Sequence, residues 1–230
     1  MMKHVIIVAG GSGKRFGSQI PKQFLPLSGL PVLMHTIRRF ARHASSITLA
    51  LPQSQMYYWK ELCGHYSFSI PTRIVAGGDS RFESVKNAIS SINIGDNDII
   101  AVHDGVRPLV SDKVITDVFN KATENGSAIP AIHVTDSIRM IDNDGFSHAV
   151  DRSRLVAVQT PQAFNARLLK KAYDVPFSTA FTDDASVYEY SGHKIHIVDG
   201  DARNIKITHP DDIEIAEKIL ANGQFDETRH

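Results

Sequence analysis

Apolar residues in the first half of the chain fall into short runs that alternate with amphipathic segments. Runs rich in β-branched residues, typical of buried strands, cover residues 4–9, 47–52, 72–78, 98–105 and 127–134. The segments between them have helical spacing or composition, at residues 31–43, 53–64, 81–92 and 112–125. This alternation is typical of a mainly parallel sheet with helices on both faces. It predicts a Rossmann-like α/β fold with a twisted, mainly parallel (mixed) sheet, in which ligands bind at the carboxyl ends of the strands.

The pattern changes after Thr135. Residues 137–150 read as two short strands around Asn143-Asp144-Gly145, which is a hairpin turn signal. The faces of this hairpin are poorly apolar for a core element. We therefore expect a surface hairpin, or an arm at about 136–156 that packs on a partner.

The rest of the chain returns to alternating elements. Helices are expected at about 165–174, around 183–191 and from Pro210 to Leu220, with a strand at 194–198. The polar residues at the end predict fraying. We expect one domain over residues 1–222 and a frayed tail over 223–230.

Composition narrows the class of protein. The chain has 230 residues, of which 42% are hydrophobic, enough for one domain with a sizeable core. No apolar run approaches the roughly 18 residues that a membrane helix needs, and the first residues read as a strand and not as a signal peptide. Cys63 is the single cysteine of the sequence, so the chain can form neither an internal disulfide nor a zinc site built from cysteines. We expect a cytoplasmic protein that does not bind membranes.

Charge is balanced overall but uneven along the chain. There are 25 basic and 25 acidic residues, yet the first acid is Glu61. The preceding residues carry only positive charges, at Lys3, Lys14, Arg15, Lys22, Arg38, Arg39, Arg42 and Lys60. A local basic region on a neutral protein indicates a polyanion site, such as one for a nucleoside triphosphate. Nucleic acid is not expected, because the chain as a whole is not basic.

A glycine-rich segment follows the first strand, at residues 8–17. Its glycines let the backbone approach a ligand and direct amides at an anion, and Lys14 and Arg15 add positive charge. It is not a Walker loop, because Arg15 stands where Ser or Thr is required. It is not a dinucleotide fingerprint either, because Phe16 replaces a glycine and the expected acid is missing. A glycine-rich turn with solvated cations remains the alternative.

Two further segments carry candidate chemistry. Residues 77–85, GGDSRFESV, are by themselves a turn followed by a helix cap. Asp104 and Arg107 follow the fourth strand, where a carboxylate can hold Mg²⁺ or accept hydrogen bonds from sugar hydroxyls. We expect neighbouring His103 to be structural. The other ten histidines show no metal-ligand spacing.

Together these motifs resemble a known family. AGGSGKRFG (9–17) with PKQFLPLSGLPVLMHTI (21–37) is similar to the signature of sugar and polyol phosphate nucleotidyltransferases, and 77–85 resembles the cytidylyltransferases among them. VDRSRLVAVQTPQAF (150–164) and TDDAS (182–186) resemble the branch that serves non-mevalonate isoprenoid synthesis. The resemblance extends to about Leu220. Departures are Gly105 and Val106, where the family often has two alanines, and Asp184, where it usually has Glu.

The resemblance implies an activity and an assembly. It implies transfer of CMP from CTP to 2-C-methyl-D-erythritol 4-phosphate, giving 4-diphosphocytidyl-2-C-methyl-D-erythritol and pyrophosphate. Mg²⁺ is the implied cofactor, without an assigned protein ligand. The arm is expected to embrace a second subunit, which makes the protein a homodimer whose active site draws on both chains.

The resemblance also implies roles for individual residues. The catalytic cations are Arg15, Lys22, Arg152 and Lys206, the last two positioning the acceptor phosphate. The nucleotide-binding residues are Ala9, Gly10, Gly11, Gly13, Lys14, Gly78, Asp79 and Ser84. The acceptor-binding residues are Asp104, Arg107, Thr135 and Thr160.

Three alternatives stay open from the sequence. A ribitol 5-phosphate cytidylyltransferase would share the front half of the chain. A non-catalytic nucleotide sensor could use the same fold, although it would not need all the cations. A dinucleotide-dependent oxidoreductase is disfavoured by Phe16 and by the missing acid.

Overall fold

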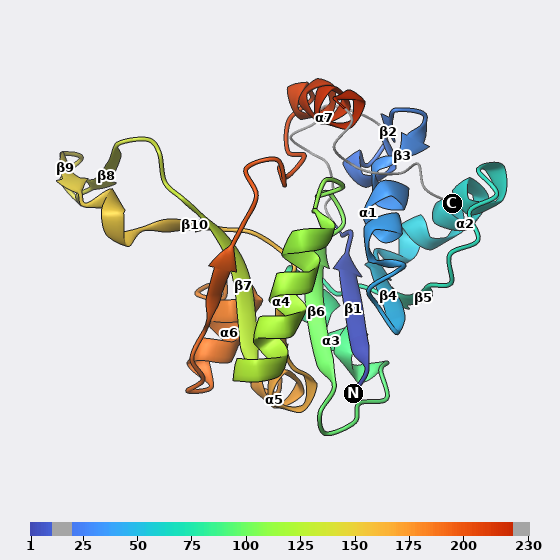
Figure 1. Ribbon diagram of the computed structural model, residues 1–230, viewed down its shortest axis with the longest axis horizontal. Coiled ribbons are helices and arrows are strands. Elements are labelled where there is room, and N and C mark those ends of the chain that lie inside the picture. Colours follow the sequence, from blue (N-terminus) through green and yellow to red (C-terminus); the bar gives the residue numbers. More distant parts are fainter. Residues whose placement is uncertain (11–19, 223–230) are drawn as a thin grey trace.

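The computed structural model describes residues 1–10 and 20–222 (Figure 1). The predictions for Gly11, Gly13, Lys14 and Arg15, and for the tail at 223–230, lie outside the described residues.

One half of the central sheet is parallel. β1 (Lys3–Val8) lies between β4 (Ser46–Leu51) and β6 (Ile99–Asp104), and β5 (Arg73–Ala76) pairs with β4. The register places Val8 beside Asp104, so the last residues of β1 and β6 meet at the same edge. This edge is where the parallel topology favours a ligand site.

The other half of the sheet is mixed. β11 (Gln162–Asn165) runs antiparallel between β6 and β7 (Ser127–His133). β10 (Val156–Val158) pairs antiparallel with β7, and β12 (Ile197–Asp199) pairs parallel with it. The prediction of a mainly parallel, mixed sheet is confirmed.

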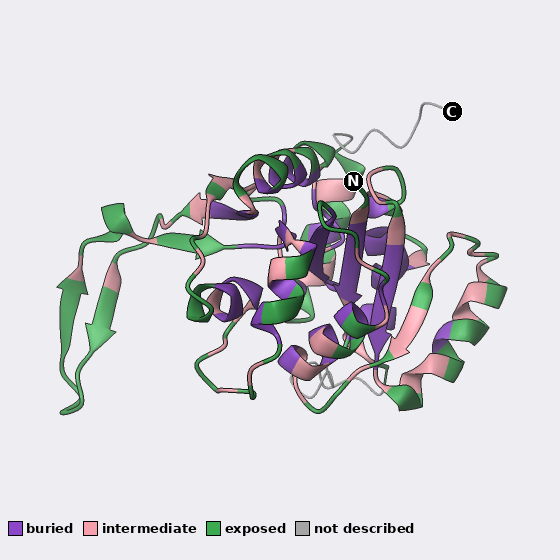
Figure 2. Cartoon of the chain, turned by 90° about the horizontal axis from the view of Figure 1, so that it is seen from below, coloured by how far each residue is buried: buried purple, intermediate pink, exposed green. Residues whose placement is uncertain are grey.

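Alternation along the strands divides the core into two layers. Val5 and Ile7 of β1 belong to one apolar cluster and Ile6 to another, because successive strand side chains point to opposite faces. All three are fully buried, and each such side chain contributes roughly 1.5–3 kcal/mol of hydrophobic stabilisation. Figure 2 shows the buried sheet enclosed between its helices.

Within the described part of the chain, three helices pack on each face of the sheet. The cluster of Val5 and Ile7 includes side chains of α1 (Val32–Phe40), α2 (Gln53–His65) and α4 (Asp112–Asn125). The cluster of Ile6 includes side chains of α3 (Arg81–Ser90), α5 (Ala166–Ala172) and α6 (Asp184–Tyr190).

A small third cluster fixes the carboxyl-terminal segment above the strand ends. α7 (Asp211–Ala221) packs near the short hairpin of β2 (Pro26–Leu27) and β3 (Leu30–Pro31). Ile207, which is fully buried, joins this cluster together with Leu27 and Ala216. Its backbone N–H also donates to the Val106 carbonyl at 2.9 Å. Ile205 packs against the same cluster, and Lys206, which lies between the two isoleucines, forms an ion pair with Asp104 at the end of β6.

The hairpin predicted around Asn143-Asp144-Gly145 is present and projects from the body (Figure 1). It consists of β8 (Ile138–Ile141) and β9 (Ser147–Val150), followed by the 3₁₀ turn η3 (Arg152–Arg154). Ile141 and Phe146 are 77% and 75% exposed. No helix among residues 1–10 and 20–222 is long and apolar enough to cross a membrane.

Candidate active site

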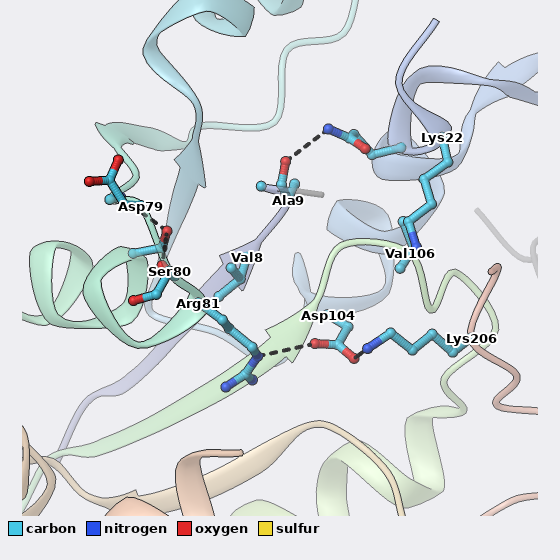
Figure 3. A pocket seen from close by; sticks show the side chains of 13 residues that line it. Val8, Ala9, Lys22, Asp79, Ser80, Arg81, Asp104, Val106 and Lys206 are labelled. Carbon is cyan, nitrogen blue, oxygen red and sulfur yellow. Dashed lines mark hydrogen bonds and ion pairs between the residues drawn. The ribbon is translucent and has the colours of Figure 1, made fainter. Parts of the chain in front are cut away.

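The candidate site is a cavity of about 300 Å³ at the carboxyl ends of β1 and β6 (Figure 3). Its lining comes from five separate parts of the chain: Val8, Ala9, Gly10, Lys22, Gln23, Gly78, Asp79, Ser80, Arg81, Ser84, Asp104, Val106 and Lys206. Lys22 stands on the 3₁₀ turn η2 (Lys22–Phe24), and Figure 3 shows its side chain directed toward Val106. Eight of the predicted site residues therefore meet in one cavity.

A tight loop forms one wall of this cavity, before α3. Ser84 Oγ accepts a hydrogen bond from the Gly78 N–H at 3.1 Å and donates one to the Ser80 carbonyl at 2.9 Å. Ser80 caps α3 in a capping box with Glu83. A Cβ on Gly78 would lie 2.3 Å from Glu83 Cβ, so this close approach requires glycine. Because the Ser84 proton is committed to Ser80, the hydroxyl can offer a ligand only an acceptor.

The end of β1 forms another part of the cavity wall. The Ala9 N–H donates to the Ala50 carbonyl at 3.0 Å, which continues the sheet pairing. The Ala9 carbonyl accepts from Gln23 Nε2 at 2.9 Å, and this buried amide also donates to Gln55 Oε1 at 2.7 Å. The predicted nucleotide contact at Ala9 is therefore limited to the second lone pair of its carbonyl. Gln23, which the sequence did not single out, holds that carbonyl in place.

Asp104 is the electrostatic centre of the site. Lys206 Nζ lies 2.8 Å from its Oδ2, Arg107 Nε 3.6 Å from the same oxygen, and Arg81 Nε 3.6 Å from Oδ1. Burial alone would raise the pKa of Asp104, but Arg81, Lys206 and Arg107 outweigh it and hold the pKa well below its usual range. The carboxylate is ionised at neutral pH, and its oxygens can accept hydrogen bonds from hydroxyl groups.

Arg107 is held on the side of the site nearest the carboxyl-terminal segment. Its Nη1 donates to the Asn204 carbonyl at 2.7 Å. Burial lowers the pKa of Arg107, which Asp104 partly opposes, and the guanidinium remains charged at neutral pH. Asn204 Nδ2 in turn donates to the Thr160 carbonyl at 2.9 Å, so the segment that carries Lys206 is fixed to the sheet.

A second hollow, of about 240 Å³, adjoins the cavity. It is lined by Arg81, Asp104, Arg107, Val158, Gln159, Thr160, Gln162, Thr182, Asp183 and Lys206. This hollow brings the predicted acceptor residues Asp104, Arg107 and Thr160 together with Lys206. We call it the acceptor-side hollow, and the first cavity the nucleotide-side cavity.

His103 determines what Thr160 can do. His103 Nε2 lies 3.1 Å from the Arg107 carbonyl, which can only accept, so Nε2 carries the ring proton. Nδ1 then accepts from Thr160 Oγ1 at 3.1 Å, and the same Oγ1 accepts from the Asp104 N–H at 3.1 Å. Burial lowers the pKa of His103 to about 4, so the ring is neutral. Within this chain Thr160 fixes the Asp104 backbone, and its proton points away from the hollow.

Two predicted site residues lie elsewhere. Thr135 and Arg152 line neither the nucleotide-side cavity nor the acceptor-side hollow. Both are exposed at the base of the arm, where Arg152 Nη1 donates to the Thr135 carbonyl. This hydrogen bond joins the two residues to each other, and the ion pairs described for Asp104 do not include Arg152.

The described residues contain no cluster of three or more His, Cys, Asp or Glu side chains that would hold a metal ion. At the site itself, Asp104 is already engaged by three cations, whereas Asp79 lines the cavity from an exposed position. A divalent ion would therefore take most of its oxygen ligands from a bound triphosphate.

A glycine-lined cavity at the ends of parallel strands, with cations converging on a carboxylate, is typical of a nucleotide-binding α/β protein. The model of the IspD family, 2-C-methyl-D-erythritol 4-phosphate cytidylyltransferase, matches residues 3–222, and the chain belongs to this family.

Individual relatives agree with the family match. The chain is 48% identical over 221 residues to the 2-C-methyl-D-erythritol 4-phosphate cytidylyltransferase of Porphyromonas gingivalis, covering 96% of this chain and 98% of the relative. It is 39% identical to that of Clostridium perfringens, covering 94% and 97%.

Solved structures agree as well. The 4-diphosphocytidyl-2C-methyl-D-erythritol synthase of Anaerococcus prevotii superposes with a TM-score of 0.81 at 27% identity, covering 96% of each chain. The Francisella tularensis enzyme gives 0.79 at 30% identity, covering 95% of this chain and 99% of that one. The fold prediction and the family resemblance are both confirmed.

Sequence reasoning did not assign Gln23, Arg81 or Asn204 to the site. Gln23 and Asn204 are fully buried polar side chains, and nothing in their local sequence distinguishes them from surface residues. Arg81 did leave a signal, because a cation in the first turn of a helix opposes the helix dipole.

Proposed function

We propose that this protein transfers CMP from CTP to 2-C-methyl-D-erythritol 4-phosphate, releasing pyrophosphate and forming 4-diphosphocytidyl-2-C-methyl-D-erythritol. Family membership over residues 3–222 supports the reaction. The observation that carries the proposal is the pairing of two adjoining hollows around one ionised carboxylate. One hollow suits a nucleotide and the other a hydroxylated phosphate.

The nucleotide-side cavity would take the cytidine end of CTP. The Gly78–Ser84 wall and the end of β1 present backbone groups at fixed positions, which suits recognition of a flat base edge. Lys22 lies where it can offset negative charge that grows on the α-phosphate and the leaving pyrophosphate. The family resemblance assigns the same role to Arg15.

The acceptor-side hollow would take the polyol phosphate. Asp104 accepts hydrogen bonds from its hydroxyls, and Arg107 and Lys206 attract its phosphate. An acceptor phosphate oxygen then attacks the α-phosphorus in line, and pyrophosphate leaves. The nucleophile is already ionised near neutral pH, so the reaction needs positioning and charge stabilisation and no strong general base.

Mg²⁺ is part of the proposal as an ion that enters with CTP. Bound to triphosphate oxygens, it would neutralise part of their charge and help pyrophosphate to leave. Asp79 is the one carboxylate of the nucleotide-side cavity that cations do not already engage in the described ion pairs.

We further propose that the arm completes the acceptor site of a second subunit. Arg152 and Thr135 lie together at its base, away from both hollows of their own chain. Met140, Ile141 and Phe146 expose apolar surface along the hairpin, which suits burial against a partner. A homodimer of this form would bring Arg152 to the neighbouring chain's acceptor phosphate. The proposal places the enzyme in the cytoplasm.

A paired assay tests the function. The protein is incubated with CTP and Mg²⁺ and either 2-C-methyl-D-erythritol 4-phosphate or ribitol 5-phosphate, and pyrophosphate release and product mass are recorded. Turnover of the first acceptor alone is expected. Turnover of ribitol 5-phosphate instead would overturn the acceptor assignment and keep the mechanism. If a folded protein that binds CTP turns over neither acceptor, the result would support a nucleotide sensor.

A further inference from the structure

Three residues line both hollows, namely Arg81, Asp104 and Lys206. Asp104 and Lys206 already have roles in the proposed reaction. Arg81 has none, although Figure 3 shows its side chain reaching from the nucleotide-side loop toward Asp104. Its position at the junction of the two hollows raises the question of what it does.

The positive charge of Arg81 is energetically unfavourable at this position unless carboxylates compensate for it. Arg81 is the first residue of α3, directly after its N-cap Ser80, where the helix dipole disfavours a cation. Its Nη2 lies 2.6 Å from Asp184 Oδ2 and its Nε 3.6 Å from Asp104 Oδ1. Burial would lower the pKa of Arg81, but Asp184 and Asp104 more than offset this and raise it. One guanidinium thus joins two acids that come from distant parts of the sequence.

Asp184 connects this ion pair to a wall of the acceptor-side hollow. It is fully buried at the start of α6, and its Oδ1 accepts from the Tyr173 hydroxyl at 2.6 Å. The preceding residues Thr182 and Asp183 line the acceptor-side hollow. Arg81 therefore ties the start of α6 to the loop that forms the nucleotide-side wall.

A second set of hydrogen bonds fixes the residues at the start of α6 to one another and to β11. Asp183 caps α6 by accepting from Ser186 N at 2.9 Å. Gln162 of β11 donates to Asp183 Oδ2 at 2.9 Å and accepts from Ala185 N at 3.0 Å. A displacement of Asp184 is thereby passed to Asp183 and to the acceptor-side wall.

We propose that Arg81 is a positioning residue that couples the two hollows: it orients Asp104 for the acceptor's hydroxyls and fixes the α6 wall relative to the nucleotide loop. This inference rests on the proposed function. The guanidinium fork is what the role requires, because a single ammonium group cannot serve both carboxylates in fixed geometry.

The test compares Arg81→Gln with Tyr173→Phe. Each variant removes one hydrogen-bond partner of Asp184, but only Arg81→Gln also releases Asp104. We expect Arg81→Gln to raise the acceptor KM by about tenfold or more, the effect of losing one charged hydrogen bond, and to leave the KM for CTP within about threefold. Tyr173→Phe should lower Tm and keep the acceptor KM within about twofold.

Three results would overturn the inference. One is an unchanged acceptor KM in Arg81→Gln. Another is an equal rise in both KM values. The third is a Tyr173→Phe variant whose acceptor KM rises together with the fall in its Tm. Arg81→Lys serves if Arg81→Gln does not fold, since it keeps the charge beside Asp184 and should still raise the acceptor KM.

A binding readout separates this inference from the proposed function. CTP bound to the wild-type protein should slow amide hydrogen exchange in α6, and Arg81→Gln should abolish that protection while still binding CTP. The wild-type protein could lack turnover while CTP still protects α6 in it and not in Arg81→Gln. That result would refute the reaction and keep the coupling. Equal protection of α6 in both proteins would refute the coupling.

Discussion

Lys206 Nζ lies 2.8 Å from Asp104 Oδ2, although the two residues come from opposite halves of the chain. The lysine side chain is 43% exposed and the aspartate side chain 11%. Exposure of the lysine weakens the contribution of this ion pair to folding stability, and Arg81 and Arg107 would still compensate the buried carboxylate without it. Its importance lies in the charge it places at the junction of the two hollows.

Lys206→Met should therefore affect activity far more than stability. We expect kcat/KM for the acceptor to fall by about a hundredfold or more, the usual scale of losing one charge-stabilising group, with little change in Tm. Steady-state kinetics and thermal unfolding check this. Lys170→Met, at an exposed position on α5, is the matched control. Near-wild-type kinetics in Lys206→Met would remove this residue from the mechanism.

Lys22→Ala should lower turnover by about a hundredfold or more, because no other described cation lies at that end of the nucleotide-side cavity. Arg15→Ala is expected to behave alike on the strength of the family resemblance. Pyrophosphate release at saturating CTP is the measurement, with Lys60→Ala on the exposed surface of α2 as control. Retained turnover in either active-site variant would refute its role.

Gly78→Ala should damage the nucleotide-side wall. The added methyl would meet Glu83 Cβ at 2.3 Å and strain the capping box, so we expect a raised KM for CTP and a lower Tm. Gly64→Ala in α2 is the contrast, because nothing lies within 4 Å of its added Cβ. That substitution should stabilise the protein by roughly 0.5–1 kcal/mol and leave kinetics unchanged. Equal effects of both substitutions would contradict the assignment.

The sequence predicted best where local chemistry decides the structure. α4 occupies the predicted residues 112–125, because Ser111 caps its start and Gly126 adopts φ 84° after its end. By contrast, β10 and β11 were not predicted. Residues 156–158 are exposed, and β11 is short with polar ends at Gln162 and Asn165, so pairing with β7 and β6 creates both strands.

The site shows the same contrast between features set by local sequence and features set by tertiary packing. Glycine-rich turns, the charge at Lys22 and the position of Asp104 at a strand end are visible in the sequence, and the family resemblance supplied Lys206. The contact between Arg81 and Asp184 could not be predicted, because only the packing of α3 against α5 and α6 brings the two together. Sequence patterns locate strand ends but do not say which distant acid a cation will meet.

Subunit mixing tests the arm. If Arg152 serves the neighbouring chain, Arg152→Ala and Lys22→Ala subunits should each be inactive as homodimers and regain activity when mixed. One of the two sites in the heterodimer would then be intact. Activity after mixing, with heterodimer formation verified by differently tagged chains, is the measurement. A verified heterodimer without any rescue would indicate that each chain builds its own complete site.

His103 should make stability depend on pH between about 6.5 and 4. Burial holds its pKa in the folded protein at about 4, against an ordinary value of 6.5, so the unfolded chain binds this proton first as pH falls. The contribution is complete above pH 6.5 and declines toward pH 4, by roughly 3 kcal/mol in total. His103→Gln should flatten the slope of unfolding free energy against pH in this window. Denaturant unfolding at several pH values measures the slope, and an unchanged slope would contradict the assignment.

The path of the segment at residues 204–208 has a consequence for protein synthesis. It contains no helix or strand and is held by Asn204, by Ile207 and by the backbone bond to Val106. Because a chain emerges amino terminus first, Asp104 and the nucleotide loop leave the ribosome long before Lys206. Until the last segment docks, Arg81 and Arg107 alone balance the carboxylate. Because Lys206 lines both hollows, the site is complete only after residues 204–208 dock, which is late in synthesis.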